Sequence, residues 1–154
     1  HQDIIKEALN KLRINKLFVI PAFCNPTKRH TKISARYRAK VIKQKYKNNR
    51  KVEICNYEIL QKKRSYSVYT ILYLKNKCKN VKNIYFIIGA DNLSKIKHWK
   101  RWGSNNGIKN NIKLVVVTRN NIKIKIRHIK IHTILNVAQN ISSSDIKTKN
   151  IGIM

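Results

Sequence analysis

The stretch IYFIIGADN, from Ile84 to Asn92, decides the fold class of this sequence. Five apolar or aromatic residues follow one another without a charge and lead into Gly89, Ala90 and Asp91. A short, continuous apolar run that stops at a glycine is typical of a buried strand in a parallel sheet. Asp91 is one of only six acidic residues in a chain with 35 Lys and Arg, so its place at the strand end calls for an explanation.

Strand and helix patterns alternate along the rest of the chain. Short apolar runs predict strands at 17–21, 51–55, 84–88, 113–119 and 131–137. Helical spacing predicts helices at 3–12, 34–46 with Ser34 as N-cap, 65–77 and 93–99, and a loop leading into a helix at 141–147. Strands that alternate with helices indicate an α/β domain in which helices cover both faces of a parallel sheet.

Asp91 lies where such a sheet binds its ligands. In open α/β sheets, ligands bind beyond the carboxyl ends of the strands. Gly89 lets the backbone turn there and lets a ligand approach closely. Asp91 can then accept hydrogen bonds, for instance from the hydroxyls of a ribose. The same residues also fit a simpler role, in which Asp91 or Asn92 caps the next helix. The local sequence leaves both interpretations open.

The net charge of +29 has two explanations. A basic chain attracts polyanions such as nucleic acids or phosphate-rich ligands. Lys, Ile and Asn are also the residues that an A/T-rich genome encodes in excess, and the basic residues are spread from Lys6 to Lys149 instead of forming one block. We favour the second explanation, so nucleic acid is not expected as a partner, although the charge favours anionic ligands.

Length and cysteine spacing narrow the class of protein. The 154 residues suit one domain, and no apolar stretch is long enough to span a membrane. Cys24, Cys55 and Cys78 lie far apart without a C-x-x-C pair, which indicates reduced thiols in a cytoplasmic protein and no zinc site. The sequence offers no Ser-His-Asp triad, no paired carboxylates and no P-loop, and we assign no metal-binding residue.

Four further segments carry residues that suit anionic or aromatic ligands. NPTK (25–28) is a basic loop after a strand, and ISSSDIK (141–147) places hydroxyls at an expected helix start, where backbone N–H groups bind anions. SYS (65–67) offers the same groups for a carboxylate, and HWKRW (98–102) offers tryptophan faces for a planar heterocycle. Taken singly, each segment also fits a solvated loop, a serine cap or helix packing.

The order of these segments resembles that in the bacterial nicotinate mononucleotide adenylyltransferases. The series is His1, FVIPAFCNPTK, SARYR, SYSVYT, YFIIGADNL, HWKRW, VVVTR and NISSSDIK, and it covers nearly the whole chain. The resemblance implies a Rossmann-like fold of the nucleotidyltransferase type, with helices on both faces of a parallel sheet. It also implies an enzyme of NAD biosynthesis that transfers the adenylyl group of ATP, with Mg²⁺, to nicotinate mononucleotide and releases pyrophosphate. The mononucleotide phosphate would attack ATP directly, so the protein would act by positioning and charge stabilisation.

The resemblance also assigns roles to individual residues. His1 matches a histidine that stabilises the transition state, and it is the implied catalytic residue. The implied ATP-binding residues are His1, Gly89, Asp91, Ser142, Ser143, Ser144 and Lys147. The implied nicotinate mononucleotide-binding residues are Lys28, Arg38, Ser65, Tyr66, Ser67, Trp99 and Arg119. Among these, Trp99 would stack on the pyridine ring.

The sequence departs from the family pattern at both ends. The first strand and most of the histidine signature are absent before His1, and the helix expected after the ISSS segment is largely absent. Lys147 stands where the family has arginine, and a lysine cannot make the planar, bidentate contact with phosphate that an arginine makes. Ser67 stands where the family has threonine. We therefore expect a single nucleotidyltransferase domain over residues 1–154 that lacks its first strand and is weak or inactive as it stands.

Other interpretations stay open in the sequence. A phosphopantetheine adenylyltransferase of the same superfamily would share His1 and the ISSS segment, but Trp99 and the pairing of SYS with GADN argue against it. A basic nucleic-acid-binding module would use tyrosines interleaved with basic residues. A decayed gene copy would explain the missing ends. The oligomeric state and the choice between the acid and amide forms of the mononucleotide are left open.

Overall fold

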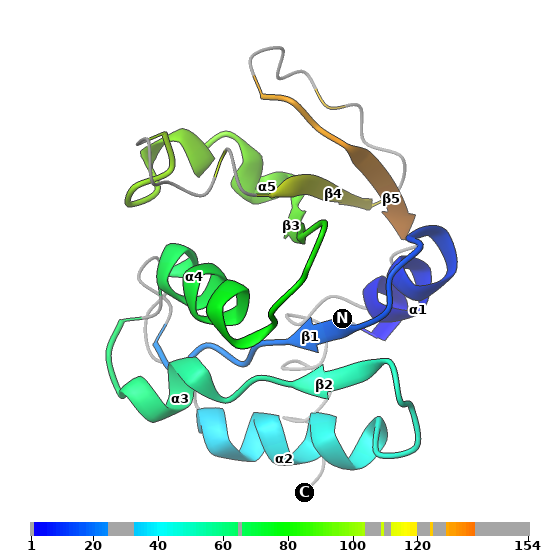
Figure 1. Cartoon of the computed structure of the whole chain (residues 1–154), viewed down its shortest axis with the longest axis vertical. Coiled ribbons are helices and arrows are strands. Elements are labelled where there is room, and N and C mark those ends of the chain that lie inside the picture. Colours follow the sequence, from blue (N-terminus) through cyan, green and yellow to red (C-terminus); the bar gives the residue numbers. More distant parts are fainter. Residues whose placement is uncertain are drawn as a thin grey trace, which may run out of the picture.

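Parallel strands and the helices that connect them make up most of the described part of this chain (Figure 1). The computed structural model describes residues 2–24, 33–64, 66–103, 109, 112–119, 124 and 129–137. The elements in chain order are α1 (Gln2–Lys11), β1 (Leu17–Val19), α2 (Ala35–Lys45), β2 (Val52–Ile54), α3 (Tyr57–Gln61), α4 (Ser67–Lys77), β3 (Tyr85–Gly89), α5 (Ala90–Leu93), the 3₁₀ helix η1 (Ile96–His98), β4 (Lys113–Arg119) and β5 (Thr133–Val137).

Most of the predicted elements are confirmed. Each of the five predicted strands overlaps an observed strand, and β4 has the predicted bounds. The predicted N-cap of the 34–46 helix is also confirmed, because the Oγ of Ser34 accepts a hydrogen bond from the backbone N–H of Tyr37. The helix predicted at 141–147 lies outside the described residues.

Two helical predictions were incomplete or wrong. The five-residue helix α3 was not predicted, because so short a segment shows no apolar periodicity. The single helix predicted at 93–99 is instead divided between α5, which starts earlier at Ala90, and η1. Leu93 and Ile96 are both fully buried. Their three-residue spacing matches one turn of a 3₁₀ helix, which keeps both side chains over the same core.

The strands form two parallel sheets in place of one continuous sheet. In the first, β1 pairs with β2 from Leu17 opposite Val52 to Val19 opposite Ile54. In the second, β4 lies between β3 and β5. Because β3 has a neighbour on one side only among the described strands, its residues are mostly half-buried, and the expectation of a fully buried strand at 84–88 was wrong.

The buried centre of the molecule is β4, where every residue from Leu114 to Thr118 is buried. Alternate side chains on a strand point to opposite faces. Leu114 and Val116 pack in one core cluster with residues of α4, α5 and η1. Val115 and Val117 pack in a second cluster with Ala8 and Leu12, which belong to α1 and the residue after it. Helices therefore cover both faces of this sheet, as the sequence predicted (Figure 1).

A buried polar contact joins α3 to α4. The hydroxyl of Thr70 donates a hydrogen bond of 2.7 Å to Oε1 of Glu58, and both side chains are buried. The rings of Tyr57 and Tyr73 stack beside it, with centroids 4.3 Å apart. These contacts fix the direction of α4, which begins at the SYS segment.

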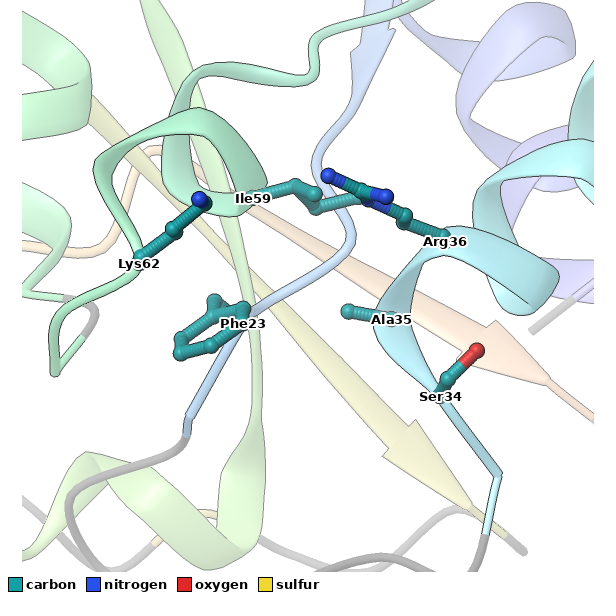
Figure 2. Close-up of a pocket in the computed structure, with 6 residues that line it drawn as sticks. All are labelled: Phe23, Ser34, Ala35, Arg36, Ile59 and Lys62. Carbon is teal, nitrogen blue, oxygen red and sulfur yellow. The ribbon is translucent and has the colours of Figure 1, made fainter.

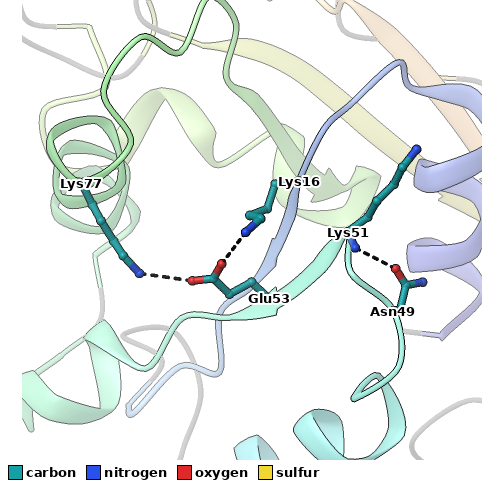
Figure 3. Close-up of polar contacts among 5 residues, drawn as sticks. All are labelled: Lys16, Asn49, Lys51, Glu53 and Lys77. Atoms are coloured by element: carbon teal, nitrogen blue, oxygen red, sulfur yellow. Dashed lines mark hydrogen bonds and ion pairs between the residues drawn. The ribbon is translucent and has the colours of Figure 1, made fainter.

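Glu53 of β2 makes exposed ion pairs with two other segments of the chain (Figure 3). Its carboxylate lies 2.9 Å from the ammonium of Lys16, before β1, and 3.2 Å from that of Lys77, at the end of α4. The hydrogen bond from Lys16 is the main cause that lowers the pKa of Glu53 below its ordinary value. Solvent screens such pairs, so each adds little to stability.

None of the helices in the described part of the chain is long and apolar enough to cross a membrane.

We predict that Thr70→Val destabilises the fold by about 1–3 kcal/mol, because it leaves the buried Glu58 carboxylate without its donor. Thr70→Ser keeps the hydroxyl and should cost less than Thr70→Val. Urea unfolding of the three proteins measures the difference. Equal losses in the valine and serine variants would show that the hydroxyl contributes nothing.

Glu53→Gln should lower stability only above the titration range of this carboxylate. Because the folded-state pKa lies below the ordinary 4.5, the ion pairs contribute fully above that value and are lost as the pH falls through the folded-state pKa. We expect a difference of less than about 1 kcal/mol at pH 7 that closes as the pH falls through the folded-state pKa. Unfolding curves over a series of pH values test this, and a difference that widens in acid would contradict it.

Candidate active site

The described residues include half of the predicted site. Within them lie Arg38, Tyr66, Ser67, Gly89, Asp91, Trp99 and Arg119. Outside them lie His1, Lys28, Ser65, Ser142, Ser143, Ser144 and Lys147. The geometry of the site therefore rests on the first group, and the roles of the second group stay predictions from the sequence.

Sheet pairing brings the ends of β3 and β4 to one edge. Gly89, the last residue of β3, lies opposite Val117, and β4 continues for two more residues to Arg119. Asp91 follows Gly89 directly in the first turn of α5, and both Asp91 and Arg119 are exposed. A carboxylate and a guanidinium therefore lie at the same carboxyl edge of the sheet, where α/β proteins bind ligands.

Gly89 is needed for space and not for an unusual backbone conformation. Its φ is −72°, which any residue adopts, so the expectation that it lets the backbone turn was wrong. A Cβ at this position would overlap sterically with the Oδ1 atom of Asp91, at a separation that Cβ atoms in proteins essentially never show. The missing side chain therefore leaves room for the Asp91 carboxylate to fold back over the end of β3.

The Asp91 carboxylate does not cap the helix that follows. The N-cap of α5 is Gly89, and neither Asp91 nor Asn92 makes a side-chain cap, so the capping interpretation was wrong. Oδ2 of Asp91 accepts a long hydrogen bond of 3.4 Å from the side-chain amide of Asn92. The exposed carboxylate has further lone pairs with which to accept hydrogen bonds from a ligand.

The two tryptophans of HWKRW have different environments. Trp102 is buried in the core cluster that includes Val68, Ile88 and Val116. Trp99 is only half-buried, and it meets the ring of Phe86 edge-on, with centroids 6.0 Å apart and planes at 78°. Helix-face packing therefore explains Trp102, while Trp99 keeps part of its surface accessible.

Tyr66 and Trp99 come together on that same core cluster. Tyr66 is the N-cap of α4 without a side-chain cap hydrogen bond, and Ser67 is the first residue of the helix. Both Tyr66 and Trp99 pack against the cluster, as does Ala90 beside Asp91. The cluster thus gathers the start of α4, the Trp99 segment and the end of β3.

Arg38 lies apart from this group, beside the smaller sheet. Its Nη2 atom donates a hydrogen bond of 2.6 Å to the carbonyl of Ala22, which joins α2 to the segment after β1. Its Nε atom is buried and has no hydrogen-bond partner among the described residues. Part of the Arg38 guanidinium therefore has a structural role.

A hollow of about 320 Å³ lies next to this segment (Figure 2). It is lined by Phe23, Ser34, Ala35, Arg36, Ile59 and Lys62. None of the predicted site residues lines it, so it does not mark the edge at which Asp91 and Trp99 lie.

One contact beside Tyr66 was not predicted. The ammonium of Lys100 lies 5.2 Å from the ring centroid of Tyr66 and 5.4 Å from that of Tyr69. In a chain with so many lysines, the sequence gives no signal that distinguishes this one. In the described ranges, no group of three or more His, Cys, Asp or Glu side chains is placed to hold a metal ion.

Comparison with known proteins gives a consistent result. The profile of the cytidylyltransferase-like family matches residues 1–149. The "probable nicotinate-nucleotide adenylyltransferase" of Aliarcobacter butzleri is 35% identical over 149 residues, which are 97% of this chain and 79% of the relative. The protein of the same name from Sulfurimonas denitrificans is 35% identical over 148 residues, which are 96% of this chain and 75% of the relative.

A solved structure has a similar fold. The nicotinic acid mononucleotide adenylyltransferase of Plasmodium falciparum, complexed with NaAD, matches with a TM-score of 0.59. The match covers 94% of this chain and 71% of the other, at 14% identity. At that identity the match supports the fold alone.

Gly89→Ala should leave stability within about 1 kcal/mol of the wild type, because the clash is with the movable end of a side chain. If Asp91 binds ATP as the family pattern predicts, the displaced carboxylate loses that hydrogen bond and ATP binding weakens about tenfold. Gly103→Ala is the matched control, since a Cβ there meets nothing within 4 Å. Calorimetric titration with ATP tests the pair, and equal affinities would contradict the role given to Gly89.

Proposed function

Because this chain belongs to the cytidylyltransferase-like family, and within it to the nicotinate-nucleotide adenylyltransferases, we propose that it works as follows. It is a nucleotidyltransferase of NAD biosynthesis. It transfers the adenylyl group of ATP to nicotinate mononucleotide and gives nicotinic acid adenine dinucleotide and pyrophosphate.

The chemistry requires little of the protein beyond position and charge. A phosphate oxygen of nicotinate mononucleotide attacks the α-phosphorus of ATP and forms a new P–O bond. The bond between the α-phosphorus and the oxygen that bridges to the β-phosphate breaks, and pyrophosphate leaves with the electron pair. Alignment of the two substrates and stabilisation of the negative charge account for catalysis of such a step.

One observation above all supports the part of the site that would bind the pyridine ring, here called the pyridine end. Tyr66 and Trp99, which the family pattern assigns to nicotinate mononucleotide, are far apart in sequence yet pack on the same core cluster. Trp99 has an accessible part of its indole for stacking on a pyridine, and the start of α4 at Tyr66 and Ser67 presents backbone N–H groups suited to a carboxylate.

The ATP end is assigned to the edge of the sheet. Asp91 would accept hydrogen bonds from a ribose, in the space that Gly89 leaves for its carboxylate. The assignments of His1, Ser142, Ser143, Ser144 and Lys147 to ATP rest on the family pattern in the sequence. His1 is proposed to bind the phosphates and to stabilise the transition state.

The remaining mononucleotide contacts are also assigned by the pattern. Lys28, Arg38, Ser65 and Arg119 would bind nicotinate mononucleotide, and Arg119 is supported by its place at the carboxyl edge. For Arg38, the assignment rests on the family pattern alone, because its Nη2 atom donates to Ala22 and its Nε atom is buried.

Magnesium would enter with ATP as part of the substrate. Mg²⁺ in nucleotide sites is bound by one or two carboxylates together with substrate phosphates. Asp91 is the acidic residue that the structure describes at this edge. The net charge of +29 would favour both substrates, because each carries negative phosphates.

We also propose a cytoplasmic location, which rests on three widely spaced cysteines without a pairing motif.

Pyrophosphate release tests the proposed function. The protein expressed from its complete reading frame is incubated with Mg²⁺ and ATP, and nicotinate mononucleotide, nicotinamide mononucleotide or phosphopantetheine is offered separately. We expect turnover with nicotinate mononucleotide well above that with the other two. Turnover with phosphopantetheine alone would keep the fold and contradict the substrate. No turnover with any acceptor, from folded protein, would contradict the assignment as an enzyme.

A further inference from the structure

The hollow beside α2 takes no part in the proposed function. It lies where three segments meet: Phe23 after β1, the first turn of α2, and Ile59 with Lys62 at the end of α3. Its volume of about 320 Å³ is at the small end of the range of ligand pockets, which is about 300–1,000 Å³. The hollow therefore has room for a ligand built on about one aromatic ring.

The floor of the hollow is apolar and firmly held. Ile59 and Ala35 are 7% and 8% exposed, and they belong to a core cluster that also contains Ala39 of α2. The large apolar ring of Phe23 is 42% exposed. Apolar surface that remains in contact with water favours the binding of a ligand that covers it.

Two cations face the space above this floor. Figure 2 shows the side chains of Arg36 and Lys62 pointing toward one another from opposite sides of Ile59. Both residues are exposed, so an anion can reach them from solvent. The start of α2 adds to the positive charge, because its first turn holds no acidic residue and the N-terminal end of a helix is positive.

Acidic side chains do not neutralise these two cations. The ion pairs of the described residues do not include Arg36 or Lys62. Glu58 of α3 does not line the hollow, and its buried carboxylate accepts a hydrogen bond from Thr70 of α4. The charges of Arg36 and Lys62 therefore favour an anionic group on a ligand that binds here.

We propose that this hollow is a second ligand site, separate from the candidate active site, and that it binds a small aromatic phosphate. The aromatic ring of the ligand packs against Phe23 and Ile59. The phosphate lies between Arg36, which can contact it at two points, and Lys62, which adds a point charge. Two cations and a helix start match a phosphate monoester, with a charge of about −2 at neutral pH, better than a carboxylate with its single charge.

A ligand in the hollow would join segments that Arg38 already connects. The guanidinium of Arg38 bonds to the carbonyl of Ala22, the residue before Phe23, and Arg38 is two residues after Arg36 in α2. A ligand in contact with Phe23 and Arg36 spans the same two segments. Because it binds the folded protein alone, it should also raise the urea concentration at which the protein unfolds.

An NMR titration with phenyl phosphate tests the site on the protein expressed from its complete reading frame. The methyl signals of Ala35 and Ile59 report binding in the hollow itself. We expect a Kd of about 1 mM, which is ordinary for a ligand of this size. Benzoate, inorganic phosphate and phenol should each bind at least about fivefold more weakly, because each lacks a charge or the ring.

Three variants and a matched control locate the contacts. Arg36→Gln and Lys62→Gln each remove one charge and should weaken phenyl phosphate binding about three- to tenfold. Phe23→Ala removes the ring and should weaken it by a similar factor. Lys40→Gln removes an exposed cation one turn further along α2, outside the hollow, and should change the Kd less than about twofold. Urea unfolding checks that each variant is folded.

Three results would overturn the proposal. The first is an equal Kd in the wild type, Arg36→Gln and Lys62→Gln, because the phosphate would then bind elsewhere. The second is an equal affinity for phenyl phosphate and inorganic phosphate, because the hollow would then attract charge without holding a ring. The third is unchanged Ala35 and Ile59 signals up to about 20 mM phenyl phosphate. Each readout is binding in the hollow and not turnover, so the proposed function is tested separately.

Discussion

The pairing of β3 with β4 is the constraint on which the site depends. Five residue pairs, from Tyr85 with Lys113 to Gly89 with Val117, hold the two strands in parallel register. The valines of β4 are buried on both faces, and full burial of a valine stabilises a fold by about 1.5–3 kcal/mol. A shift of one residue would turn each apolar side chain to the opposite face. The register therefore fixes where Gly89 and Arg119 end their strands.

One core cluster then connects that register to the ligand-binding segments. Val68 of α4, Ile88 of β3 and Ile96 of η1 are buried together, and Tyr66 and Trp99 pack on the outside of the same cluster. The buried bond from Thr70 to Glu58 fixes the other side of α4. Hydrophobic packing thus holds Tyr66 and Trp99. The Asp91 carboxylate at the sheet edge can take its position because Gly89 has no side chain.

The sequence predicted those parts of the fold and site that leave a local pattern. The sequence alone predicted three features: the β-branched strand β4, the Ser34 cap of α2, and the position of Asp91 just after a strand. The division into two sheets could not be predicted, because pairing between distant strands leaves no local signal. The position of Lys100 over two tyrosine rings and the steric role of Gly89 also depend on tertiary contacts.

A crystal structure of the protein with nicotinic acid adenine dinucleotide bound would test the central claim most directly. That claim is that the cluster under Tyr66 and Trp99 and the edge at Gly89 and Asp91 form the two ends of one site. We predict that the pyridine ring stacks on Trp99 and that Asp91 accepts a hydrogen bond from a ribose hydroxyl. A pyridine ring bound away from Trp99, with no ribose contact to Asp91, would contradict it.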